Sequence, residues 1–440
     1  MKRPVVIVLL TVALTLVCAG IAAVAFFFWG IGGGLPTNNP FDVMNVSSQV
    51  EENKTLKVDA AKPVTLKVTD DAGDVTITGG DVKSVEVKVV KTAYDSSQAR
   101  ADEEVKTLKY TVEQTGNTIT LKYQLPNSIN IRNKVDTVDF IVTVPTETIV
   151  DVDNQSGDVT VSAINGKVTV ETAFGEINAD NLEGAVSLTT NSGTVTATSI
   201  KANEGDIILK SDFGALTLEK ANGKDITIDT NSGTVKLDEV RATGKLSLST
   251  QFGDVSYENG SANSVFVKTN SGSISLTKLT VAKDIHVEDE FGTLKLDQAL
   301  AASYDLQTNS GDITVDGAKG ELAADTQFGG IDITNAEAVT LNLKTNSGAV
   351  NFSGTLGVGA HTVKSEFGAV DLTLPADVKL NVDLTTEFGK IKSDMPIAVN
   401  VTETSGSNSS KDQLVGTING GGDLLTVETN NGDVTIHASK

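Results

Sequence analysis

The chain reads Asn231-Ser232-Gly233-Thr234-Val235-Lys236-Leu237 at one corner and Gln251-Phe252-Gly253-Asp254-Val255-Ser256-Tyr257 at the next. Ser-Gly and Phe-Gly corners of this kind alternate through most of the sequence. Their glycines lie 18 to 21 residues apart until Gly389, after which the step to Gly432 is 43 residues. A fixed period of this size is typical of a solenoid, in which each repeat packs only on its neighbours. The corner glycines are Gly157, Gly175, Gly193, Gly214, Gly233, Gly253, Gly272, Gly292, Gly311, Gly329, Gly348, Gly368, Gly389 and Gly432.

Each corner glycine is followed by an alternating pattern. The residue two places on is apolar at every corner, the next is polar, and the fourth is apolar except at Ser393. A second alternating stretch follows half a repeat later, as in Val168 and Val170 or Leu246 and Leu248. Strict period-two alternation indicates strands with one buried face. The sequence therefore predicts an all-β, single-stranded β-solenoid (β-helix) with coils of about 20 residues.

Seven phenylalanines precede corner glycines and are the candidate ligand-binding residues: Phe174, Phe213, Phe252, Phe291, Phe328, Phe367 and Phe388. They alternate with serine, except that Phe367 and Phe388 occupy successive corners. Strand parity puts Phe174 on the same face as Val168 and Val170, which predicts that the phenylalanines fill an interior corner. The alternative is an exposed aromatic stripe with a ring about every 9.6 Å, near the length of a disaccharide.

The N-terminal region has a different composition. Residues 5–29 carry no charge and are predicted to form a transmembrane helix after a cytoplasmic stub of residues 1–4, with Lys2 and Arg3 keeping that stub inside. A cleaved signal peptide is the alternative. Lipidation of Cys18, the sole cysteine, is disfavoured because Val17 is too large for a lipobox. Residues 30–54 are predicted to be a flexible linker.

Residues 55–150 are predicted to cap the solenoid, and residues 151–440 to form its regular repeats. Ala72-Gly73-Asp74-Val75 already resembles a corner. A helix is expected over residues 95–108, with Asp95 as its cap and Ala101, Val105 and Leu108 on its packed face. We expect this helix to cover the open end of the solenoid, and a docking role is the alternative.

The composition limits which partners and which catalytic or metal sites the chain can have. The net charge of −22 argues against nucleic acid or anionic lipid as a partner. The histidines, at 286, 361 and 437, lie in separate repeats without metal-ligand spacing. A calcium-repeat interpretation of Gly420-Gly421-Gly422-Asp423 is disfavoured because the pattern occurs once. We therefore expect no catalytic residue, no metal and no cofactor.

Two stretches carry a family resemblance: Ser156 to Val161, a Ser-Gly-Asp-Val-Thr-Val corner, and Val415 to Ile436 near the C-terminus. Together with the periodicity they resemble a bacterial and archaeal domain family of unknown function, described as "putative adhesins" and related to the head GIN domain. The resemblance covers roughly residues 55–438. It implies a β-solenoid at the cell envelope or surface, and some relatives accompany envelope-stress regulators.

The predicted function is a membrane-anchored, surface-exposed β-solenoid with a non-catalytic role in adhesion or envelope interaction. Its N-terminus would be cytoplasmic, its solenoid extracellular, and its partner a cell-surface glycan or an envelope protein. The alternative is the ectodomain of an envelope-stress sensing system that acts through a membrane partner. A glycan-active enzyme is disfavoured because loops long enough to roof a cleft are scarce.

Overall fold

The computed structural model describes residues 46–59, 61–125, 135–404 and 412–439. Residues 47–440 form a compact unit with its own hydrophobic core. The predicted transmembrane helix at 5–29, the stub at 1–4 and most of the predicted linker lie outside the described residues. Within the described ranges, no helix is both long and apolar enough to cross a membrane.

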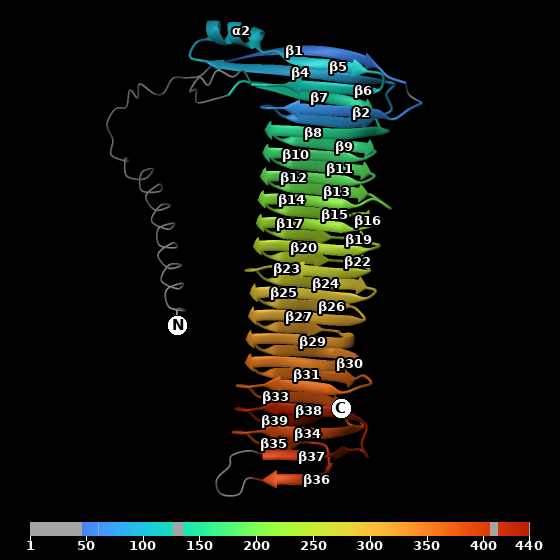
Figure 1. Cartoon of the computed structure of the whole chain (residues 1–440), viewed down its shortest axis with the longest axis vertical. Coiled ribbons are helices and arrows are strands. Elements are labelled where there is room, and N and C mark those ends of the chain that lie inside the picture. The colour runs from blue at the N-terminus through green and yellow to red at the C-terminus, as the bar shows by residue number, and fades with distance from the viewer. Residues whose placement is uncertain (1–45, 60, 126–134, 405–411, 440) are drawn as a thin grey trace, which may run out of the picture. The chain divides into compact units, whose positions relative to one another are not determined.

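Parallel strands stack in two sheets on opposite sides of a common core, which confirms the all-β solenoid (Figure 1). We call them the front and back sheets. Front-sheet strands are β2 (Val64–Asp70), β8 (Thr148–Ser156), β10 (Val168–Phe174), β12 (Val186–Ser192), β14 (Ile207–Phe213), β17 (Ile226–Ser232), β20 (Lys245–Phe252), β23 (Ser264–Lys268), β25 (Asp284–Phe291), β27 (Ser303–Ser310), β29 (Lys319–Phe328), β32 (His361–Ser365), β34 (Leu380–Thr386) and β38 (Asp423–Thr429).

The back sheet receives the chain after each corner. Its strands are β3 (Val75–Gly80), β9 (Val159–Asn165), β11 (Ile177–Glu183), β13 (Val195–Lys201), β15 (Leu216–Glu219), β16 (Asn222–Gly223), β18 (Val235–Asp238), β19 (Arg241–Ala242), β21 (Val255–Glu258), β22 (Ser261–Ala262), β24 (Ile274–Val281), β26 (Leu294–Leu300), β28 (Ile313–Asp316), β31 (Val350–Leu356), β33 (Val370–Pro375), β35 (Ile391–Ser393) and β39 (Val434–Ser439). The long strand β30 (Ile331–Ser347) contributes to both sheets.

Equivalent residues of successive coils lie directly above one another. Val170 pairs with Leu188, Leu188 with Leu209, and Leu209 with Ile228. All four side chains are almost completely buried. The alternation read from the sequence therefore becomes continuous columns of stacked aliphatic side chains, and burial of apolar surface along these columns stabilises the fold.

A further bend, which the sequence analysis did not predict, lies six residues after most corner glycines. The backbone there has a φ between 51° and 58°, in the left-handed region that costs a side-chain-bearing residue free energy. At one coil the equivalent residue is Gly317. The non-glycine members are Ala163, Asn181, Ser199, Lys220, Glu239, Asn259, Lys278, Gln298 and Asn335.

The N-terminal end is closed by strands that change direction. β2 lies between β6 (Thr118–Tyr123) and β8, and β3 lies between β7 (Thr137–Pro145) and β9, all in parallel pairs. β4 (Ser84–Asp95) then pairs antiparallel with β7, and β5 (Tyr110–Thr115) with β6. β1 (Val46–Lys57) pairs with β4. These strands satisfy backbone groups that an open solenoid end would expose.

The predicted helix is present as α2 (Gln98–Thr107), and Ala101, Val105 and Leu108 are buried as expected. Its cap was predicted wrongly. Ser97 is the N-cap residue, and it makes no side-chain capping bond. The Asp95 carboxylate instead accepts a hydrogen bond from the Ser96 amide. The edges of β7 and β6 are paired by the antiparallel strands β4 and β5. The helix contacts β4, so it packs on one of these closing strands, and the strands themselves cover the open end.

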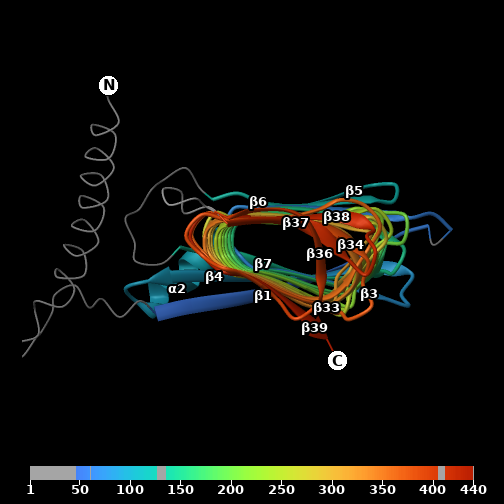
Figure 2. The ribbon, with the colours of Figure 1, turned by 90° about the horizontal axis from the view of Figure 1, so that it is seen from below.

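The C-terminal end inserts its last coil between two earlier ones. β38 pairs with β32 on one side and β34 on the other, and β39 pairs with β33 and β35. β37 (Asp412–Ile418) then runs antiparallel to β34, and β36 (Ile397–Thr404) antiparallel to β37. Figure 2 views this end along the stack and shows β36 and β37 on the near side of the coils.

Candidate ligand-binding surfaces

A column of buried polar side chains lies at the corners that follow the front strands, and most of its members donate a hydrogen bond to a corner glycine of the neighbouring coil. Thr190 Oγ1 donates to the Gly175 carbonyl oxygen at 3.1 Å, and Thr230 Oγ1 donates to that of Gly214 at 3.2 Å. In each pair the glycine belongs to the preceding coil. Because the bonds run between coils, they fix the corner in register. The column comprises Asp70, Asn154, Thr172, Thr190, Ser211, Thr230, Thr250, Thr269, Asp289, Thr308, Thr326, Thr345, Ser365, Thr386 and Thr429.

Glycine is required at this corner because successive backbones approach closely. A Cβ atom added to Gly233 would overlap the carbonyl group of Gly214, and one added to Gly214 would overlap that of Gly193. The same overlap recurs at nearly every corner. The corner glycines therefore form a stack in which each leaves room for the carbonyl group of the one before it.

All seven candidate phenylalanines are exposed, with 54% to 66% of their surface accessible. The prediction that they fill the interior is wrong. Thr172 is buried and pairs with Thr190, whereas Phe174 pairs with Ser192, and Ala173 pairs with neither neighbouring strand. The chain turns at this unpaired residue, so the period-two parity ends at Thr172 and Phe174 points outward.

The exposed rings form one column with an unbroken large–small alternation. Phe174 pairs with Ser192, Ser192 with Phe213, and Phe213 with Ser232. Near the C-terminus, the coil ending in Asn431 lies between those ending in Phe367 and Phe388. Phe367 and Phe388 follow each other in the sequence of corners, but they are not neighbours in the structure, and the alternation continues there. In this Phe column (the seven phenylalanines), rings recur every second coil, about 9.6 Å apart.

A second column, one residue before the first, carries amides and carboxylates. Asn231 Nδ2 donates to Asp212 Oδ1 at 3.3 Å, and Gln251 Nε2 donates to Asn231 Oδ1 at 3.1 Å. Asparagine stands in every serine coil after the first, which has Gln155, and Asp, Gln or Glu stands in most phenylalanine coils. We call these residues the polar column: Asn191, Asp212, Asn231, Gln251, Asn270, Glu290, Asn309, Gln327, Asn346, Glu366, Asn430 and Glu387.

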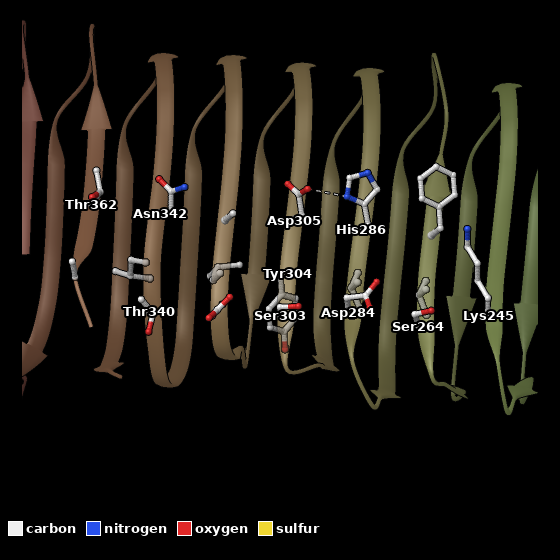
Figure 3. A pocket seen from close by; sticks show the side chains of 18 residues that line it. Lys245, Ser264, Asp284, His286, Ser303, Tyr304, Asp305, Thr340, Asn342 and Thr362 are labelled. Atoms are coloured by element: carbon white, nitrogen blue, oxygen red, sulfur yellow. Dashed lines mark hydrogen bonds and ion pairs between the residues drawn. The ribbon is translucent and has the colours of Figure 1, made fainter. Parts of the chain in front are cut away.

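The front sheet also bears a shallow hollow of about 940 Å³ (Figure 3). The Phe266 ring stacks on His286 with centroids 5.4 Å apart, and Lys245 Nζ lies 4.9 Å from the Phe266 ring centroid. His286 Nδ1 and Nε2 each lie 2.9 Å from a carboxylate oxygen, of Asp305 and Glu288 respectively. The aromatic and imidazole groups are thus engaged with each other and with neighbouring side chains.

The three histidines remain apart, as the sequence analysis expected. Burial lowers the pKa of His361, and a hydrogen bond to Asp394 raises the pKa of the exposed His437. Among the described residues, no group of three or more His, Cys, Asp or Glu side chains could hold a metal ion. Of the two candidate surfaces, the Phe column and the hollow on the front sheet, the Phe column is more regular and accessible, because its rings recur every second coil and each is more than half exposed.

The chain belongs to the Toastrack DUF4097 family, whose model matches residues 65–321 and 259–437. This confirms the resemblance noted in the sequence. Two similar solved structures are a "putative cell adhesion protein" from Clostridium sporogenes and a "putative adhesin" from Bacteroides fragilis. The first has 9% identity and a TM-score of 0.18, covering 89% of this chain and 100% of its own. The second has 15% identity and a TM-score of 0.29, covering 65% and 97%. No curated protein matches this chain.

Proposed function

We propose that this chain is a non-catalytic adhesion protein that binds an extended, repetitive partner through the Phe column. The observation that supports this most directly is the regular exposure of seven aromatic rings along one corner. Exposed aromatic side chains in contiguous arrays are typical of binding surfaces. A partner that repeats along its length can engage many weak sites at once, which raises its overall affinity.

We further propose that residues 5–29 anchor the protein in the cell membrane and that the solenoid is displayed outside the cell. The uncharged length of this segment and the preceding Lys2 and Arg3 support this topology. An acidic, β-rich body suits display, because charge repulsion limits association between copies.

The proposal is tested by removing rings from the middle of the column. Phe213→Ser, Phe252→Ser and Phe291→Ser are combined, since serine already occupies the equivalent corner of neighbouring coils. Residues 47–440 are labelled and their binding to intact cells is measured. We expect the triple variant to lose most binding while keeping the parent melting temperature.

A matched control removes exposed apolar surface elsewhere. Val358 is 89% exposed and lies outside the column, so Val358→Ser should bind as the parent does. Equal cell binding by the triple variant and the parent would show that the Phe column is not the adhesive surface.

A further inference from the structure

We propose that the partner of the Phe column is a neutral, β-1,4-linked polysaccharide whose disaccharide unit matches two coils. This inference rests on the proposed function and names the class of ligand for the same surface. Three features carry it: the spacing of the rings, the hydrogen-bonding groups beside them, and the sign of the surrounding charge.

The spacing of the rings favours a polysaccharide with β-1,4 linkages. Rings recur every second coil, about 9.6 Å apart, with Ser192, Ser232 and similar small residues between them. In an extended β-1,4-linked chain each sugar is turned over relative to the last, so the same sugar face recurs once per disaccharide. One ring can then stack on every second sugar, while the serine coils leave space for the intervening one. An α-1,4-linked chain coils, so its sugars do not present the same face at this regular spacing along the column.

The polar column supplies complementary chemistry. Each two-coil unit places one ring beside one asparagine amide and, in most units, one Asp, Gln or Glu side chain. Amides donate and accept hydrogen bonds, and carboxylates accept them from hydroxyl groups. Binding sites that combine an apolar surface with a few fixed polar groups provide both affinity and orientation. The arrangement suits a sugar, which has an apolar ring face and a hydroxyl-bearing edge.

Charge excludes the anionic polysaccharides. The chain carries a net charge of −22, and Asp212, Glu290, Glu366 and Glu387 lie beside four of the rings. A uronic-acid or sulfated polymer would place further negative charges along this line, and like charges would oppose its binding. A neutral or N-acetylated chain meets no such penalty.

Isothermal titration of residues 47–440 with cellohexaose and N-acetylchitohexaose tests the proposal, with maltohexaose as the α-linked control. We expect at least one β-1,4-linked hexamer to bind, more tightly than its own trimer, and maltohexaose not to bind. A hexamer spans about three rings, and Phe328, Phe367 and Phe388 would remain as a run of that length in the triple variant, so here all seven phenylalanines are replaced by serine. Binding should weaken by roughly tenfold for each ring that the hexamer contacts.

A variant of unchanged composition tests the spacing. In a reference variant whose Phe328, Phe367 and Phe388 are serine, a hexamer can contact only the rings from Phe174 to Phe291. Adding Ser232→Phe together with Phe252→Ser moves one of these rings by a single coil and leaves the total apolar surface the same. Hexamer binding should fall by about tenfold if phase matters. Equal hexamer binding by the swap variant and the reference variant would overturn the proposal that the disaccharide unit matches two coils.

The remaining outcomes separate this inference from the adhesive function. If neither β-1,4-linked hexamer binds, yet the triple Phe→Ser variant still loses cell binding, the column is adhesive and its partner belongs to another class. If analytical ultracentrifugation shows that the parent is a dimer and the triple variant a monomer, the column joins two copies of this chain and the glycan proposal fails.

Discussion

Asp289 occupies the position in the buried corner column that Asn154 occupies near its N-terminal end, but only the asparagine donates a hydrogen bond to the glycine of the preceding coil. Asn154 Nδ2 lies 3.2 Å from the Gly73 carbonyl oxygen, and its Oδ1 accepts from the Ser156 amide. Asp289 Oδ1 accepts from the Phe291 amide in the same way. Its Oδ2 is buried without a hydrogen-bond partner. A carboxylate has no proton to donate, so the link at Asp289 is missing. Thr172 and Thr269 also make no such bond, although a hydroxyl group could donate one.

Asp289→Asn should therefore stabilise the solenoid at pH 7 by about 1–3 kcal/mol, because the amide can donate where the carboxylate cannot. Residues 47–440 with and without the change are compared by thermal unfolding. Asp284→Asn, at an exposed carboxylate on the same strand, is the control and should leave the melting temperature unchanged. A lower melting temperature for Asp289→Asn would contradict the missing-link explanation.

The same residue should make stability depend on pH. Burial raises the pKa of Asp289 from 3.8 to about 6, so the folded protein binds this proton more tightly than the unfolded chain. The resulting stabilisation is fully present below pH 3.8 and is lost as pH rises through 6. Its size is about 3 kcal/mol. Unfolding between pH 4 and 7 should show a smaller decline in Asp289→Asn than in the parent, and identical slopes would contradict this assignment.

Corner glycines should tolerate no side chain. In Gly233→Ala the new methyl group would overlap the Gly214 carbonyl, so the coils must separate there, and we expect a loss of several kcal/mol. Gly80→Ala is the matched control, because the nearest atoms to its Cβ lie 3.8 Å away. Melting temperatures of the two variants provide the measurement. Similar values would show that the corner can relax.

The left-handed bend should respond in the opposite direction. Lys278 has a φ of 51°, which glycine adopts without strain, so Lys278→Gly should stabilise the protein by about 0.5–1 kcal/mol. Gly317→Ala should cost about 1 kcal/mol for backbone reasons alone, since its nearest neighbour to a Cβ lies 3.8 Å away. Denaturant titration of both variants tests the pair, and a destabilising Lys278→Gly would contradict it.

Single ring removals should scarcely affect stability. Phe252 is 58% exposed, so Phe252→Ala should change the free energy of unfolding by no more than about 0.5 kcal/mol. Phe352 is 2% exposed, and Phe352→Ala should cost about 3–5 kcal/mol. The two melting temperatures distinguish a surface ring from a core ring. A large loss in Phe252→Ala would restore the interior placement that strand parity suggested.

The sequence was sufficient for the periodic part of the fold. The spaced glycines reflect the close approach of successive backbones, and the alternation after them, as at Val235 and Leu237, reflects burial. Both signals lie within one coil and recur in nearly every repeat. The left-handed bend was less visible, because Lys220, Glu239 and Gln298 are not residues that usually mark a positive φ.

The direction of the phenylalanines depended on information outside one strand. The unpaired Ala173 breaks the parity, and only the register between neighbouring coils reveals it. The position of the last coil was hidden for a related reason. Nothing within residues 423–439 specifies insertion between Ser365 and Thr386, since parallel pairing joins coils that are similar in pattern.

The inserted C-terminal coil has a consequence for biosynthesis. Thr429 Oγ1 donates to the Gly368 carbonyl, and Thr386 Oγ1 donates to that of Gly432. Residues 380–386 therefore cannot reach their final partners until residues 412–429 have been made. A ribosome that stopped before residue 423 would release a molecule with an unfilled gap and exposed strand edges, which proteases and chaperones recognise. The placement of this coil makes the folding of residues 380–386 depend on the synthesis of residues 423–439.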